Sequence, residues 1–132
     1  MTYASDQPFR FAHSVYFTLA DRSSRTMNDF RAACVKYLSG HPGQIFFAVG
    51  LRALEMRRDV NDSSFDVAME MIFDTFASYD AYRKEPRHEE FITVTAGMST
   101  RRRVFDWYLT DPVTVPAQAP EKEAKEKTRS PK

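Results

Sequence analysis

The chain of 132 residues is poor in cysteine and glycine, with one cysteine and 4 glycines. A single cysteine excludes a disulfide within the chain and any zinc or iron–sulfur site that needs several cysteines. Cys34 lies in an apolar pattern, so we expect it to be a buried small hydrophobe. No apolar run can span a bilayer, and Met1–Arg10 lacks the apolar core of a signal peptide. These absences predict a cytoplasmic protein without a membrane partner.

The sequence also lacks an excess of charge of one sign. It has 19 basic and 18 acidic side chains and a formal net charge of +1, so its overall charge does not attract nucleic acid. The basic run Arg101–Arg103 begins a predicted strand, in which neighbouring side chains point to opposite faces. We therefore expect no nucleic-acid partner, and any other partner has to be recognised by a local site.

The chain is well supplied with material for one hydrophobic core. Hydrophobic residues make up 42% of the sequence, and 11 residues are phenylalanine. This length suits a single domain. After residue 110 the composition changes to prolines and then to alternating Glu and Lys. We expect an N-terminal arm over residues 1–10, one globular domain over 11–110 and a disordered tail over 111–132.

Local patterns in the first half predict a strand, a helix and a second strand. His13–Leu19 is rich in the aromatic and branched residues that strands favour. After a capping serine at Ser23 or Ser24, apolar residues recur at spacings of three and four, which predicts a helix that ends at Gly40. The apolar residues of this helix are Met27, Phe30, Cys34, Tyr37 and Leu38. The β-rich run Gln44–Leu54 follows as a second strand.

The second half predicts two strands around a broken helix. Phe65–Phe73 alternates between larger apolar residues and others, as a strand with one buried face does. Thr75 can cap a helix, but Pro86 cannot lie inside an unbroken one. We therefore place Pro86 in the first turn of a second helical segment that runs to about Ala96. Arg101–Leu109 is the last predicted strand.

The order βαββαβ is that of an α+β ferredoxin-like domain, with helices on one face of a four-stranded antiparallel sheet. Its other face is apolar too. The candidates for that face are Tyr16, Phe46, Ile72 and either Phe105 with Trp107 or Val104 with Tyr108. Leaving five such side chains in water would forgo roughly 1.5–3 kcal/mol each, a sum comparable with the whole 5–15 kcal/mol stability of a domain. We expect a homodimer in which two sheets pack face to face as a dimeric α+β barrel.

Three stretches of the sequence resemble a known family, the stress-responsive A/B barrel domain. They are the opening strand His13–Phe17, the stretch Tyr82–Phe91 with its proline, and the closing Val104–Asp106. The resemblance spans His13 to about Asp106. Many members of the family carry a histidine just before this proline, whereas Glu85 occupies that position here.

The resemblance implies a homodimeric barrel with a cavity between sheet and helices in each subunit. For most members of the family the activity is unknown. One plant member is a polyketide cyclase that performs an intramolecular aldol closure with a tyrosine and a histidine of its second helix. Those two residues fall on Tyr82 and His88 of this sequence, and a first-strand histidine falls on His13. The resemblance thus makes His88, Tyr82 and His13 the candidate catalytic residues, with no cofactor and no metal.

The residues themselves leave both a structural and a catalytic interpretation open. The break at Pro86 can direct His88 toward the same cavity as Tyr82, where the imidazole would act as general base and the phenol as hydrogen-bond donor. In the structural interpretation His88 bonds a backbone carbonyl or Glu85. His13, on an apolar strand, is more typical of a hydrogen-bonded core histidine than of a ligand.

We favour a barrel that binds a small apolar or aromatic molecule, with a cyclase-like enzyme as the alternative. Monooxygenase chemistry fits less well, because the site residues of the related monooxygenase barrels have no counterparts in register. A metal site built from His13, His88 and Glu85 lacks any supporting short-range spacing. His41, between Gly40 and Pro42, is interpreted as a turn residue.

Overall fold

The computed structural model of the chain describes residues 8–117. Its elements are β1 (Arg10–Leu19), α1 (Ser24–Leu38), β2 (Gln44–Leu51), β3 (Val67–Phe73), α2 (Phe76–Arg83), α3 (Pro86–Val94) and β4 (Ser99–Leu109). The strands form one antiparallel sheet in the order β2-β3-β1-β4. This arrangement confirms the ferredoxin-like α+β fold, with the second helix divided into α2 and α3.

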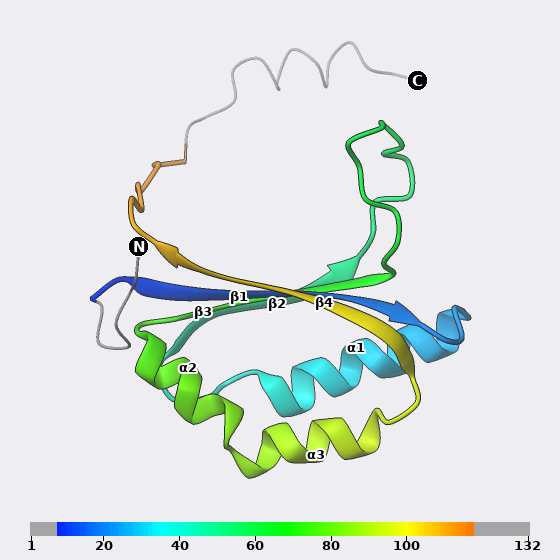
Figure 1. Cartoon of the computed structure of the whole chain (residues 1–132), viewed down its shortest axis with the longest axis horizontal. Helices are drawn as coiled ribbons and strands as arrows, with labels where there is room; N and C mark the ends of the chain where they lie inside the picture. The colour runs from blue at the N-terminus through cyan, green and yellow to red at the C-terminus, as the bar shows by residue number, and fades with distance from the viewer. Residues whose placement is uncertain (1–7, 118–132) are drawn as a thin grey trace.

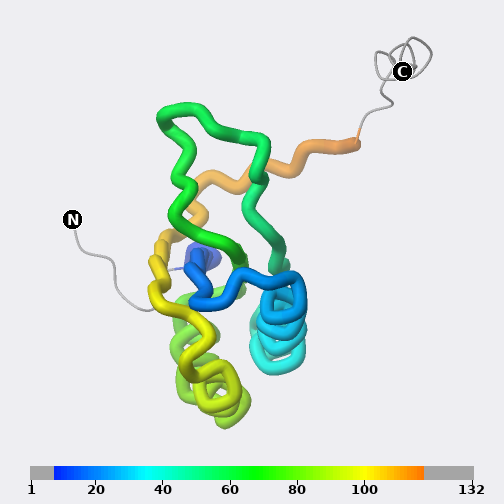
Figure 2. Tube along the Cα trace, turned by 90° about the vertical axis from the view of Figure 1, so that its right-hand side faces the viewer, coloured from blue at the N-terminus to red at the C-terminus, as the bar shows by residue number. Residues whose placement is uncertain are grey.

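Within residues 8–117, the sheet has helices on one side only. In Figure 1 all three helices lie below the sheet, and Figure 2 shows the same two layers from the side. The β2–β3 connection and the segment after β4 rise on the other side of the sheet, at its two ends (Figure 1). We call the side without helices the open face. Within residues 8–117, no helix is long and apolar enough to cross a membrane.

Helix ends follow the predicted capping chemistry. The Ser23 hydroxyl accepts a hydrogen bond from the backbone N–H of Thr26 at the start of α1, and Thr75 does the same for Ser78 at the start of α2. Pro86 occupies the first turn of α3, where its missing N–H leaves no partner unsatisfied. The predicted break in the helix is confirmed at this point.

The hydrophobic core fills the space between the sheet and the helices. From α1 it receives Phe30, Cys34 and Leu38, the centre of the predicted apolar stripe. The prediction for Cys34 is confirmed, because its side chain is fully buried and burial raises the pKa of the thiol to about 12. A thiol with this pKa stays protonated at neutral pH and is a poor nucleophile.

Four predicted strand ends were wrong. β1 begins at Arg10 rather than His13, and β2 ends at Leu51 rather than Leu54. β3 begins at Val67 rather than Phe65, and β4 begins at Ser99 rather than Arg101. The Phe65 ring lies outside the strand against Tyr16, with 5.0 Å between ring centroids. The apolar alternation in the sequence therefore begins at Phe65, two residues before the start of the paired strand.

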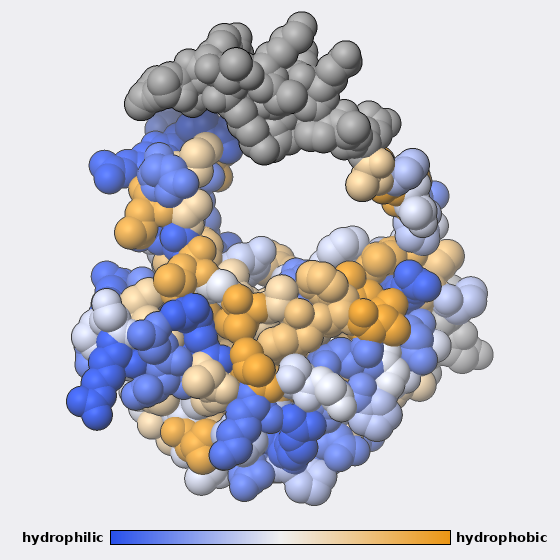
Figure 3. All heavy atoms as spheres, turned by 180° about the vertical axis from the view of Figure 1, so that it is seen from behind, coloured by the Kyte–Doolittle hydropathy of each residue, from blue (hydrophilic) through white to orange (hydrophobic). Residues whose placement is uncertain are grey.

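The register of the sheet decides which residues of β4 face outward. Val104 pairs with Val15 on the helix side, so Phe105 and Trp107 point to the open face. Phe46, Phe105 and Trp107 are each about half exposed, at 49%, 46% and 48%. Figure 3 shows apolar surface in a band at the level of the sheet, whereas the surface of the helices is mostly polar. The open face therefore carries large apolar side chains, as the sequence predicts.

The predicted domain limits at 10 and 110 stay predictions. Residues 112–117 have no helix or strand and are exposed. The N-terminal arm up to residue 7 and the rest of the tail, 118–132, lie outside the described residues.

Candidate functional site

A cavity of about 210 Å³ lies between the helix side of the sheet and helices α2 and α3. Its polar lining consists of His13, Tyr79, Tyr82, Arg83, His88 and Arg102. The rest of the lining is apolar and includes Val15 and Met69 of the sheet and Ile92 of α3. The structure thus places all three residues singled out from the sequence around one space.

The break at Pro86 brings Tyr82 and His88 together. On an unbroken helix a spacing of six residues would turn the two side chains about 120° apart. Instead α2 ends at Arg83 and α3 starts at Pro86, and the two rings meet edge to face. Their centroids are 5.0 Å apart and their planes are at 84°. A local break in the chain thus converts a poor helical spacing into direct contact.

His88 presents a buried nitrogen without a protein partner. Its Nδ1 atom is buried and has no hydrogen bond among the described residues, so neither of the structural partners expected for His88 is bonded to this atom. Burial lowers the pKa of His88, and the charges of His13, His41 and Arg102 lower it further, against an opposing effect of Glu89. The imidazole is therefore neutral at neutral pH. A neutral ring with a free nitrogen can accept a proton or a hydrogen bond from a ligand.

Tyr82 makes ring contacts with two histidines. It is only 2% exposed, and burial raises the pKa of its phenol, with a smaller contribution from Tyr79. The phenol therefore stays protonated and can donate a hydrogen bond. Besides His88, the ring of His41 lies edge-on to Tyr82 at a centroid distance of 4.9 Å.

The interpretation of His41 as only a turn residue was wrong. His41 is 5% exposed, and its Nε2 donates to the backbone carbonyl of Tyr37 over 2.8 Å. The ring enters the core because Gly40 and Gly43 on either side of the turn adopt positive φ angles of 77° and 82°, which favour glycine. His41 therefore packs against Tyr82 and does not line the cavity.

His13 combines a core position with a place in the cavity lining. Its Nδ1 lies 2.6 Å from Oδ1 of Asp106 on the neighbouring strand, where the register places the two residues opposite each other. The His13 ring also lies against Tyr79, at 4.8 Å between centroids. The carboxylate fixes the ring and its tautomer with the proton on Nδ1, as expected for a hydrogen-bonded core histidine.

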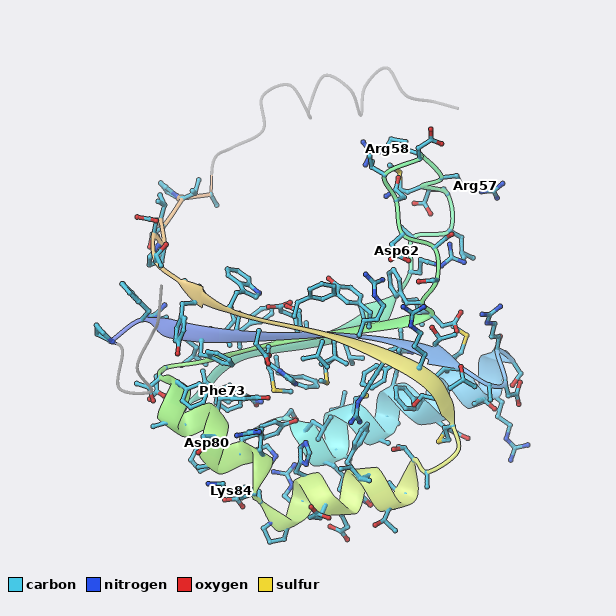
Figure 4. All side chains as sticks on the ribbon, in the orientation of Figure 1. Arg57, Arg58, Asp62, Phe73, Asp80 and Lys84 are labelled. Atoms are coloured by element: carbon cyan, nitrogen blue, oxygen red, sulfur yellow. The ribbon has the colours of Figure 1, made fainter. Side chains whose placement is uncertain are left out.

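Arg83 at the end of α2 is held by neighbours on its own helix. Its guanidinium forms an ion pair with Asp80 and lies over the Tyr79 ring, 5.5 Å from the centroid. Lys84 approaches the same carboxylate at 3.3 Å. Figure 4 shows Asp80 on α2 and Lys84 at its C-terminal end, on the helix side of the sheet. Asp80 therefore balances the positive charge that Arg83 brings to the cavity.

Two other candidates receive no support as ligands. Glu85, which replaces the histidine found in many relatives, does not line the cavity. It is the N-cap residue of α3, and its side chain makes no capping hydrogen bond. Within residues 8–117, no group of three histidine, cysteine or acidic side chains is placed to hold a metal ion.

A larger cavity of about 510 Å³ lies on the open face. It is formed by the β2–β3 connection together with Tyr16, Arg103 and Phe105, and none of its lining residues is a histidine. Figure 4 shows Arg57 and Arg58 at the tip of this connection, far from the helices. The larger cavity is therefore separate from the site around His88, with the sheet between them.

Sequence reasoning missed Asp106 and Arg102 as neighbours of this site. Alternation along β4 places Arg102, Val104 and Asp106 on one face, so the pattern held part of the signal. Which face that is depends on pairing with β1, and His13 and Asp106 are 93 residues apart in sequence. The sequence of either strand alone does not determine how two such distant strands pair.

Comparison with known proteins identifies the fold and the family. The family model described as Stress responsive A/B Barrel Domain matches residues 11–109. The chain belongs to this family. The resemblance carried by the His13, Tyr82 and Val104 stretches is thereby confirmed. None of the curated proteins matches the chain.

Several solved structures share the A/B barrel fold. A dimeric ferredoxin-like protein of unknown function from Thermobifida fusca is 19% identical, has a TM-score of 0.64, and its match covers 79% of this chain and 94% of its own. A Dabb family protein from Mesorhizobium loti is 22% identical at a TM-score of 0.64, covering 80% and 99%. The hydroxynitrile lyase of Passiflora edulis is 16% identical at a TM-score of 0.64, covering 82% and 100%. At these identities the structures establish the fold alone, and some of the proteins that share it are enzymes.

Proposed function

We propose that the protein is a homodimer in which each subunit binds a small apolar or aromatic molecule in the cavity beside His88. The dimer is supported by the half-exposed Phe46, Phe105 and Trp107 on the open face, and by solved relatives that are dimeric. Covering these side chains with a second sheet removes apolar surface from water, which is the main favourable term in association. The cavity lies on the other side of the sheet and stays accessible in such a dimer.

The observation that carries the ligand proposal is the unpaired Nδ1 of His88 beside the phenol of Tyr82. A buried polar atom without a partner costs free energy, and this cost is offset when a ligand supplies the hydrogen bond. The cavity of about 210 Å³ exceeds the roughly 150 Å³ in which an engineered apolar cavity binds benzene. One aromatic ring with a polar substituent therefore fits.

Thermal unfolding of the full chain with benzamide tests this proposal. Benzamide that binds only the folded state stabilises it by RT ln(1 + c/Kd) at a free concentration c, so the melting temperature rises with benzamide concentration. Val104→Trp fills the cavity from β4 and is expected to abolish the increase. Val94→Trp is the matched control, because Val94 is similarly exposed on α3 and does not line the cavity. Equal stabilisation of both variants by benzamide would place the binding elsewhere and contradict the proposal.

A cofactor-free enzyme of the cyclase type is the second candidate, favoured by the neutral imidazole and protonated phenol in contact. In an aldol closure, a free nitrogen of His88 would take a proton from the carbon next to a carbonyl. The resulting enolate oxygen would accept a hydrogen bond from Tyr82, and its carbon would attack a second carbonyl of the same molecule. The site contains the two groups that the first half of this reaction needs.

Exchange of the methyl protons of acetophenone in D₂O, followed by NMR, isolates that first half. The enzyme hypothesis predicts exchange above the buffer rate, reduced by His88→Ala and by Tyr82→Phe. Exchange at the buffer rate with the wild-type chain would contradict the enzyme hypothesis and would not affect the proposed binding function.

A further inference from the structure

Arg102 stands apart from the other two arginines of its run. The register of β4 places it opposite Phe17 on the helix side of the sheet, whereas Arg101 and Arg103 point to the open face. Arg103 is paired there with Asp62. Arg102 has no hydrogen bond or ion pair among residues 8–117, so its guanidinium is not committed to any described carboxylate.

The Arg102 side chain lies where two cavities adjoin. It lines the cavity of about 210 Å³ that contains His88 and also a second cavity of about 170 Å³ near Gly97. The two cavities share Phe17, Phe91 and Ile92 as common walls. The shared walls are apolar, and the guanidinium of Arg102 lies at the boundary of both cavities.

The charges around this position are unbalanced toward positive. Among the described residues, no aspartate or glutamate lines either cavity. The other arginine of the lining, Arg83, is neutralised by Asp80. The charge of Arg102 lowers the pKa of His88, and Glu89, which does not line the cavity, acts on the same ring in the opposite sense. An anionic group that enters the cavity would therefore meet one uncompensated positive charge and no opposing carboxylate in the walls.

We propose that the cavity is selective for anionic ligands, namely small aryl or alkyl carboxylates whose carboxylate is bound by Arg102 and whose apolar body fills the space beside His88. This inference rests on the proposed binding function and adds its specificity. A planar guanidinium presents paired N–H donors that match the two oxygens of a carboxylate. The apolar walls contributed by Val15, Met69 and Ile92 accommodate the body of the ligand, and His88 and Tyr82 remain available to its second polar group.

Benzoate and benzamide form a nearly isosteric pair that differs in charge. Dissociation constants of the full chain for each are measured by calorimetry at low salt, for the wild type and three variants. Arg102→Gln removes the charge, Arg102→Lys keeps it without the planar fork, and Arg101→Gln removes a neighbouring charge from the opposite face. Because Arg102 is exposed and screened by solvent, the expected effect is moderate.

Arg102→Gln is expected to weaken benzoate binding about fivefold and to weaken benzamide binding less. Arg101→Gln is expected to change neither, and Arg102→Lys to retain part of the benzoate affinity. Added salt is expected to weaken benzoate binding to the wild type only. Unchanged benzoate affinity in Arg102→Gln, or an equal loss for both probes, would overturn the selectivity while leaving the binding function in place. Failure of both probes to bind the wild type at millimolar concentration would overturn both proposals.

Discussion

The imidazole of His88 stands edge-on to the Tyr82 ring, with 5.0 Å between the centroids, and one of its nitrogens is buried without a protein partner. His41 makes a similar ring contact with Tyr82 at 4.9 Å but does have a partner, the carbonyl of Tyr37. Two histidines thus contact the same tyrosine ring, one with a hydrogen-bonded nitrogen and one with a buried nitrogen that has no protein partner. His41 is built into the core, whereas His88 retains capacity to bind.

This difference predicts opposite responses to truncation. His41→Ala leaves the Tyr37 carbonyl without its donor in a buried place, which costs about 1–3 kcal/mol of unfolding free energy. His88→Ala removes no hydrogen bond of its free nitrogen and is expected to cost less than about 1 kcal/mol, while weakening ligand binding. Chemical denaturation of both variants measures the costs. A larger loss for His88→Ala than for His41→Ala would assign His88 a structural role.

The pKa of His88 predicts a dependence of stability on pH. Burial holds the pKa of the folded state below the unfolded value, which is about 6.5. Near that pH the unfolded chain binds more protons, so stability falls as the pH drops from about 7 toward the folded-state pKa and then becomes independent of this group. The His88→Ala variant should lack this component. Denaturation curves of the wild type and of His88→Ala are measured at several pH values below 7. The difference between their unfolding free energies at each pH gives the contribution of His88.

Neighbouring charges shift the pKa of His88 in known directions, and NMR titration of the ring can check each shift. Glu89→Gln removes the group that raises the pKa and should lower it further, whereas Arg102→Gln should raise it. Shifts of the opposite sign in either variant would show that these charges do not act on the ring as the structure places them.

The open face predicts a dimer that one substitution can dissociate. Phe105→Glu introduces a charge into the proposed interface, where burying an unpaired carboxylate costs several kcal/mol, and a monomer is expected. Val35→Glu is the matched control, because Val35 is 49% exposed on α1 at the helix layer. Light scattering at micromolar concentration reports the mass of each. A monomeric wild type, or a dimeric Phe105→Glu variant, would remove the sheet-to-sheet interface.

The elements of the fold were largely readable from local patterns. The apolar stripe of α1, the caps Ser23 and Thr75 and the break at Pro86 depend on neighbours within a few residues, and each was confirmed. Four of the eight predicted strand ends were wrong, because pairing across the sheet decides where a strand stops. Phe65 continues the alternation of β3 but lies outside the paired region.

The candidate site was predictable only in part. The contact between Tyr82 and His88 follows from a break that the sequence shows. The burial of His41 and the pairing of His13 with Asp106 depend on turn geometry and on the register of distant strands, which no local pattern encodes. The position of Arg102 beside the cavity has the same origin.

Chemical-shift mapping of the full chain with benzamide tests the central claim most directly, because the larger cavity lies on the other side of the sheet. Binding beside His88 predicts amide shifts that concentrate at α3 and the helix-facing part of β4, around Ile92 and Val104, together with shifts of the His88 ring. Shifts centred on Arg52 and the β2–β3 connection, or none at saturating concentration, would contradict the proposed ligand site.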